Sequence, residues 1–180
     1  MTALHTERPG RPAALAAATV GGVGIVEHPA HKLARVAPDY DGLALLEAIR
    51  SGELPPPPIA ELLGFTIHDL APGEVTFAFE PALEHYNPIG SVHGGVAATL
   101  LDTVMGCALQ TLLPRGVGYT TLDISVRYLR PMTADSGTVF ATGTVVHHGR
   151  RTATAEARVV DATLGRVLAT GTSTLLVVER

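Results

Sequence analysis

The segment from Asn87 to Leu113 combines two adjacent glycines with one acidic residue inside a long apolar run. Gly94 and Gly95 open that run, which has the length and composition of a helix. The first turn of a helix leaves backbone N–H groups unpaired and carries the positive end of the helix dipole. Glycines there let a ligand approach these groups, so a developing negative oxygen would be stabilised. Close packing of helix on strand is the alternative explanation for the glycines.

Asp102 is the only charged side chain between His93 and Arg115. A carboxylate in apolar surroundings is costly unless it is paired or used. A carboxylate that is partly shielded from water can act as a nucleophile or a general base, and Asp102 is the candidate for that role. The alternative is a structural carboxylate held by threonine hydroxyls or by backbone donors.

Three further polar residues accompany the glycines and the carboxylate. Asn87 precedes a proline and is either a turn residue or an amide that orients a water molecule or a substrate carbonyl. His93 is a candidate base, but its position just before the glycines favours hydrogen bonding that holds the loop. Thr121 falls on the polar face of a predicted strand, where the pattern by itself requires no function for the hydroxyl.

A predicted hairpin tip carries two histidines followed by two arginines. Adjacent residues of a strand point to opposite faces, so His147 and His148 make a poor metal pair. No Cys/His spacing of the zinc type occurs either, and the sequence predicts no metal site. Arg150 and Arg151 are either solvated surface charges or contacts to the phosphates of a nucleotide-bearing substrate.

Hydrophobic periodicity predicts the elements that position these residues. A short helix is expected at 41–50, capped by Asp39 or Asp41 and ended by Ser51-Gly52. The predicted strands are 65–70, 74–80, 119–128, 138–146, 152–160 and 167–178. The strand at 119–128 alternates strictly, which assigns to one face Leu122, Ile124, Val126 and Tyr128, and to the other Thr121, Asp123, Ser125 and Arg127.

A helix that is apolar on every side must be covered on every side. The sequence therefore predicts an α+β fold, with a curved antiparallel sheet wrapped around a long central helix and a second subunit covering the remainder. Residues 1–37 are predicted as a flexible extension, 38–58 as the short helix and a proline-rich connector, and 59–180 as the main folded domain.

Composition narrows the possible functions. The chain of 180 residues is 46% hydrophobic and 17% charged, with a net charge of −4, which argues against disorder and against nucleic-acid binding. Asp102 interrupts the apolar run and argues against a membrane span. The single cysteine and the absence of a small-x-small cleavage site near the start favour a reducing, cytoplasmic compartment.

Taken together, these features resemble the hotdog-fold thioesterase superfamily, and specifically the PaaI-type acyl-CoA thioesterases of phenylacetate degradation. The resemblance covers about residues 59–178. It rests on Asn87 followed by His93-Gly94-Gly95, on Asp102 in the apolar helix, and on the segments TLDISVRYLRP and GRVLATGTSTLLVV. It implies a hotdog subunit, a homodimer with active sites at the interface, often a homotetramer, and hydrolysis of acyl-CoA without metal or cofactor.

The resemblance also implies roles for individual residues. The Gly94 N–H polarises the thioester carbonyl, Asp102 attacks it or activates water, and Asn87 helps to place the water or the carbonyl. Thr121 falls where the family often has a Ser or Thr, supplied by the partner subunit, that orients the nucleophile. Substrate contacts are expected from His93, Gly95, Arg150 and Arg151. Open alternatives are a non-catalytic acyl-CoA binding module and an acyl-CoA hydratase or dehydratase, and the acyl group is left open among aryl, phenylacetyl and fatty acyl.

Overall fold

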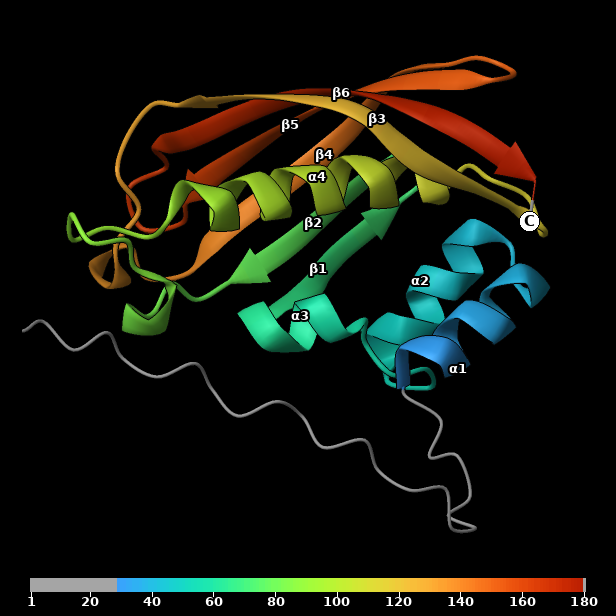
Figure 1. Ribbon diagram of the computed structural model, residues 1–180, viewed down its shortest axis with the longest axis horizontal. Helices are drawn as coiled ribbons and strands as arrows, with labels where there is room; N and C mark the ends of the chain where they lie inside the picture. Colours follow the sequence, from blue (N-terminus) through green and yellow to red (C-terminus); the bar gives the residue numbers. More distant parts are fainter. Residues whose placement is uncertain (1–28, 180) are drawn as a thin grey trace, which may run out of the picture.

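The computed structural model describes residues 29–179 and shows an antiparallel sheet that curves around one long helix, α4 (Gly94–Gln110) (Figure 1). The sheet has six strands in the order β1-β2-β4-β5-β6-β3. The strands are β1 (Phe65–Ala71), β2 (Glu74–Phe79), β3 (Val117–Tyr128), β4 (Val139–His148), β5 (Thr152–Asp161) and β6 (Val167–Glu179). The predicted α+β hotdog arrangement is confirmed.

The apolar composition of α4 is explained by the way the sheet covers it. The residues that face the sheet are fully buried: Leu100, Leu101, Val104, Met105, Ala108 and Leu109. Glycine allows the closest approach, because a Cβ at Gly143 of β4 would lie 2.4 Å from the Val104 carbonyl. The opposite side of α4 is only half buried, and it carries Asp102. The candidate carboxylate therefore lies on the side of the helix away from the core.

Within the described residues three short helices precede the sheet (Figure 1), and the second of them contacts both α4 and β1. They are α1 (Pro29–Val36), α2 (Gly42–Ser51) and α3 (Pro58–Leu63), and short 3₁₀ turns occur at Ala37–Asp39, Leu83–His85 and Ala134–Ser136. The predicted short helix is confirmed as α2. Its N-cap is Asp41, whose carboxylate accepts a hydrogen bond from the Ala44 N–H at 3.0 Å. Its C-cap is Gly52, which adopts a positive φ of 81°.

The predicted boundaries before the sheet need two corrections. Part of the expected flexible extension is α1, because Leu33 and Val36 pack against a small core that includes Leu45 and Leu54. The remainder of that extension, residues 1–28, lies outside the described residues. The expected proline connector ends in α3, because a proline in the first turn of a helix removes an N–H that has no partner there.

Strand β3 departs from the strict alternation that its sequence predicts. Thr121 pairs with Leu175 of β6, whereas Asp123 pairs with the adjacent Thr174, so Leu122 is an extra residue in a β-bulge. Leu175 is fully buried against the helix, and its partner Thr121 therefore faces the helix as well. The prediction that Thr121 shares the outward face with Asp123 was wrong, because the bulge inverts the alternation between them.

Candidate active site

The start of α4 presents one backbone amide to solvent. His93 is the N-cap, and its Nδ1 accepts a hydrogen bond from the Gly95 N–H at 2.9 Å. The Val96 N–H donates to the His93 carbonyl at 2.9 Å. Within residues 29–179 no acceptor contacts the Gly94 N–H. The Gly94 N–H is therefore the available donor at the positive end of the helix. Gly95 was expected as a substrate contact, but its N–H donates to His93 instead.

Tyr128 also holds the peptide unit that joins Gly94 to Gly95. Its hydroxyl donates a hydrogen bond to the Gly94 carbonyl at 3.0 Å, while the N–H of that peptide, on Gly95, is held by His93. A Cβ at Gly94 would lie 3.1 Å from Cζ of Tyr128, so glycine is what lets the ring pack there. Sequence reasoning missed this role. Alternation predicted an inward-facing Tyr128, but no local signal relates its hydroxyl to a helix 34 residues earlier in the chain.

Asn87 lies beside this helix start. Its Oδ1 accepts hydrogen bonds from the Ile89 N–H at 3.0 Å and the Ser91 N–H at 3.3 Å, and its Nδ2 donates to the Ser91 hydroxyl at 3.2 Å. An amide nitrogen carries two hydrogens, so one donor remains. Asn87, Gly94 and Tyr128 line one cleft of about 420 Å³. The structure therefore brings together two of the expected site residues and adds the tyrosine.

Asp102 and Thr121 form the other group. The Thr121 hydroxyl donates to Oδ1 of Asp102 at 2.9 Å, and both side chains are half buried. Among the described residues, Oδ2 of Asp102 has no hydrogen-bond donor. One oxygen is thus fixed in orientation and the other is available to accept a proton or to attack a carbon. Because the hydrogen bond joins residues of one chain, any site that uses Asp102 receives Thr121 from the same subunit.

The two groups are separate within one chain. An α-helix rises about 1.5 Å per residue, so Asp102 lies roughly 12 Å further along the axis of α4 than Gly94. Strand β3 contacts both groups, through Thr121 at one end and Tyr128 at the other. One subunit therefore holds two half-sites, an amide half and a carboxylate half.

The two arginines that were expected to contact substrate lie elsewhere. Arg150 and Arg151 are exposed in the turn between β4 and β5, where the Arg151 carbonyl accepts from the Val177 N–H at 2.9 Å. The structure does not bring either arginine to Gly94 or Asp102 of the same chain. Their role as phosphate contacts stays a prediction.

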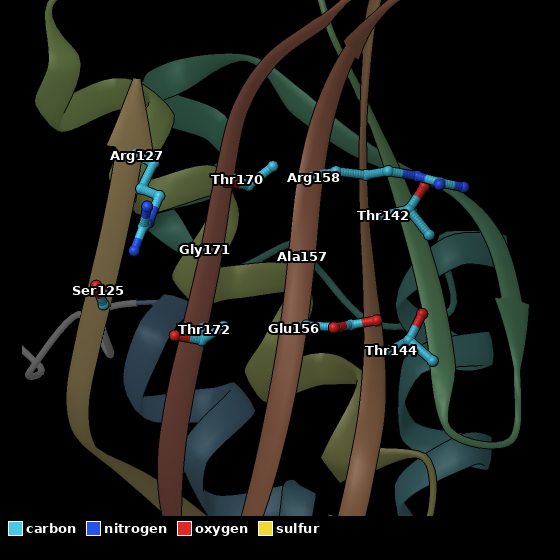
Figure 2. Close-up of a pocket in the computed structure, with 10 residues that line it drawn as sticks. All are labelled: Ser125, Arg127, Thr142, Thr144, Glu156, Ala157, Arg158, Thr170, Gly171 and Thr172. Atoms are coloured by element: carbon cyan, nitrogen blue, oxygen red, sulfur yellow. The ribbon is translucent and has the colours of Figure 1, made fainter. Parts of the chain in front are cut away.

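A separate hollow of about 510 Å³ lies on the outer face of the sheet, with α4 behind the strands (Figure 2). Its charged side chains are Arg127, Glu156 and Arg158, and the rest of the lining includes serine and threonine side chains from β3, β4 and β6. These residues alternate with residues that face α4, such as the buried Ala155 of β5. The hollow is therefore on the opposite side of the sheet from both half-sites.

Cys107 lies near the carboxylate half-site. Burial, and secondarily the Asp102 carboxylate, raise the pKa of its thiol to about 12, although a hydrogen bond with Tyr119 acts in the opposite direction. A thiol with a raised pKa stays protonated below that value, and the thiolate is the reactive form. Cys107 is therefore unsuited to act as a nucleophile at neutral pH.

We expect Cys107 to react with iodoacetamide at pH 8 at least about 10²-fold more slowly than free cysteine, because so little thiolate is present. Mass spectrometry of the native protein across pH 7 to 10 would measure the rate, with the unfolded protein as the control. A rate that rises and levels off around pH 8.5 would contradict the raised pKa.

Residues 29–179 contain neither a metal-binding cluster nor a membrane-spanning helix. No group of three or more His, Cys, Asp or Glu side chains is arranged to hold a metal ion. No helix in this range is long and apolar enough to cross a membrane. The expectation that catalysis needs no metal or cofactor stays a prediction.

The chain is similar to known proteins over the region that holds both half-sites. Residues 89–168 match the thioesterase superfamily. Human acyl-coenzyme A thioesterase 13 is 30% identical over 109 residues, which are 61% of this chain and 76% of the human protein. Among solved structures, a point mutant of phenylacetic acid degradation protein PaaI from Thermus thermophilus is 34% identical with a TM-score of 0.60, covering 66% of this chain and 97% of that one.

A Streptococcus mutans protein solved with acetyl-CoA bound is also similar. It is 28% identical with a TM-score of 0.59, and the match covers 64% of this chain and 90% of that one. Sequence and structure thus agree on one family over most of the length of each relative. The chain belongs to the hotdog-fold thioesterase superfamily, in its PaaI-type group.

Proposed function

We propose that the protein is an acyl-CoA thioesterase that hydrolyses its substrate to a free acid and CoA. The observation that carries the proposal is the pair of half-sites: a free Gly94 N–H at a helix start, and an Asp102 carboxylate with one oxygen held and one available. Two relatives support the substrate class. The human relative is named an acyl-coenzyme A thioesterase, and the Streptococcus relative was solved with acetyl-CoA bound.

A complete site forms between two subunits in this proposal. Strand β3 is at the edge of the sheet, and its apolar residues Leu122 and Ile124 are 55% and 38% exposed. Edge strands present unpaired backbone groups, and antiparallel pairing of two β3 strands about a two-fold axis would join the sheets. With the axis near Ile124, the Tyr128 end of each strand lies beside the partner's Thr121. The Gly94 N–H of one subunit then faces the partner's Asp102.

The chemistry follows from the two halves. The thioester carbonyl oxygen accepts a hydrogen bond from the Gly94 N–H, which stabilises the negative charge that develops there. Asp102 either takes a proton from a water molecule that attacks the carbonyl carbon, or attacks that carbon itself to give an anhydride that water then opens. In both routes the C–S bond breaks, the sulfur receives a proton, and the acid is released. The Thr121 hydroxyl holds the Asp102 carboxylate in position. The remaining side-chain N–H of Asn87 can orient the water molecule or the thioester carbonyl.

We further propose that two dimers form a homotetramer and that the enzyme is cytoplasmic. The outer face of the sheet, with the hollow in Figure 2, has no element of residues 29–179 packed on it in Figure 1 and is available for dimer association. Light scattering at several concentrations would separate dimer from tetramer.

The direct test is release of free CoA, followed with a thiol reagent, from short, medium, long-chain, phenylacetyl, hydroxyphenylacetyl and benzoyl esters. The expected result is steady turnover of at least one ester class without added metal. Binding of these esters without release would overturn the proposal in favour of a binding module. Loss of the double bond of an enoyl ester with its thioester intact would favour a hydratase.

Tyr128→Phe is expected to lower kcat about 2- to 10-fold with little change in KM, because it removes one hydrogen bond of ordinary strength to the Gly94 carbonyl, in the peptide unit next to the one that carries the Gly94 N–H. The ring remains in place, so the melting temperature should change little. Tyr40→Phe is the matched control, since it removes a tyrosine hydroxyl that donates to Glu53 away from the site. A kcat equal to that of the control would show that the Tyr128 hydroxyl has no positioning role.

A further inference from the structure

An apolar cavity of about 210 Å³ lies between the N-terminal helices and α4. The walls come from α2, from the prolines between α2 and α3, from α3, and from the start of the sheet. Leu46, Ile49, Phe65 and Phe77 supply much of the lining. Ligand pockets for drug-sized molecules typically measure about 300 to 1,000 Å³, so this cavity suits one part of a substrate and is too small for a coenzyme.

The cavity is next to the carboxylate half-site. Thr103, the residue after Asp102, lines it, and so does Cys107, whose pKa is raised partly by the Asp102 charge. A second cleft of about 670 Å³ shares the walls formed by Leu46, Ile49, Pro57 and Cys107 and extends to Thr121, the hydrogen-bond partner of Asp102. The apolar cavity and the carboxylate are therefore joined by common walls around α4.

We propose that this cavity binds the acyl group of the substrate, and that the segment from α2 to α3 limits the length of the chain that fits. The inference rests on the proposed thioesterase function and specifies its substrate class. The lining is apolar except for Thr66, Thr103 and Arg50, and the Arg50 guanidinium already pairs with Glu47 at 2.6 Å. It therefore selects an uncharged apolar acyl group, because a charged group would enter apolar surroundings or have to displace that ion pair. The small volume and the rigid proline wall select short to medium chains over long ones.

The wild-type protein should show this selection in a series of straight-chain acyl-CoA esters from acetyl to palmitoyl. Each methylene buried in the cavity should raise kcat/KM roughly fourfold until the cavity is full. Beyond that length kcat/KM should stop rising or fall. Esters of dicarboxylic acids, which carry a terminal charge, should be poorer substrates than their uncharged counterparts of equal length.

Two substitutions test which residues set the limit. Thr103→Phe adds volume at the cavity wall and should lower the ratio of medium-chain to acetyl kcat/KM at least tenfold. Ile59→Ala removes volume from α3, where Ile59 is 45% exposed and lines the cavity, and should move the optimum to longer chains. Leu62→Ala is the matched control on the same helix, because Leu62 is 76% exposed and does not line the cavity.

The outcomes separate this inference from the function on which it depends. Absence of CoA release by the wild-type protein from every ester would overturn the thioesterase proposal itself. Turnover by the wild type, with the same chain-length optimum in Thr103→Phe, Ile59→Ala and Leu62→Ala, would overturn the cavity assignment alone. Opposite shifts in the first two variants and none in the third would establish it.

Discussion

Replacement of Asp102 by Asn should lower kcat for acyl-CoA hydrolysis by about 10²- to 10⁴-fold, which is the usual contribution of a positioned acid–base group. The amide retains an oxygen that can accept the Thr121 hydrogen bond, so the local structure should persist. Substrate affinity should change little, because the carboxylate acts on the reacting atoms. The measurement is steady-state CoA release across the ester panel, with the melting temperature recorded for each protein.

Asp123→Asn provides the control for this experiment. Asp123 is also a carboxylate at the bulge of β3, but it faces outward and accepts a hydrogen bond from the Thr174 N–H at 3.2 Å. Its replacement should leave turnover within about twofold of the wild type, as is usual for surface substitutions. Full activity in Asp102→Asn would contradict the catalytic assignment of Asp102, whatever activity the control variant shows.

Gly94→Pro should lower kcat by about 10²- to 10³-fold, because proline has no N–H and one oxyanion donor is typically worth that much. The backbone at this position accommodates proline, although the added Cβ presses on the Tyr128 ring. Gly94 is the first residue of α4, and His93 has φ −59° and ψ 133°, which is the conformation preferred before proline. Gly94→Ala keeps the N–H and adds the same Cβ beside the Tyr128 ring, so the ratio of the two variants isolates the amide.

Mixing the two inactive proteins tests whether the site spans two subunits. A heterodimer of Gly94→Pro and Asp102→Asn contains one composite site with both groups intact. After random exchange half of the dimers are mixed and one of their two sites is complete, so about a quarter of wild-type activity should return. No recovery after verified exchange would contradict a site that combines Gly94 of one subunit with Asp102 of the other.

Much of the fold could be predicted because its periodicities are strong. The sheet strands either alternate or are continuously apolar, and the helix that begins at Gly94 is apolar throughout. The observed bounds of these elements therefore differ from the predicted ones by a few residues at most. The capping of α2 by Asp41 likewise follows from local chemistry. Gly94 and Asp102 were found in the same way, as residue types that are costly or unusual within such a helix.

The parts that could not be predicted depend on contacts between distant segments. The bulge that turns Thr121 toward Asp102 is seen only in the pairing of β3 with β6. Helix α3 begins with a proline that, by sequence alone, fits an extended connector equally well. The contact of Tyr128 with Gly94, and the cavity behind Thr103, arise from elements that come together only in three dimensions.

The position of β3 at the sheet edge also has a consequence for the order of folding. Within the described chain β3 pairs with β6, which is synthesised after all the other strands, and their contacts join residues about fifty positions apart. Such distant pairings form late, because a long loop must close before any contact is gained. On the ribosome, Thr121 thus has no strand to hold it opposite Asp102 until β6 has emerged. The Asp102 carboxylate acquires its fixed orientation in one of the last steps of folding, together with the burial of the β6 side chains, such as Leu175, that complete the apolar core.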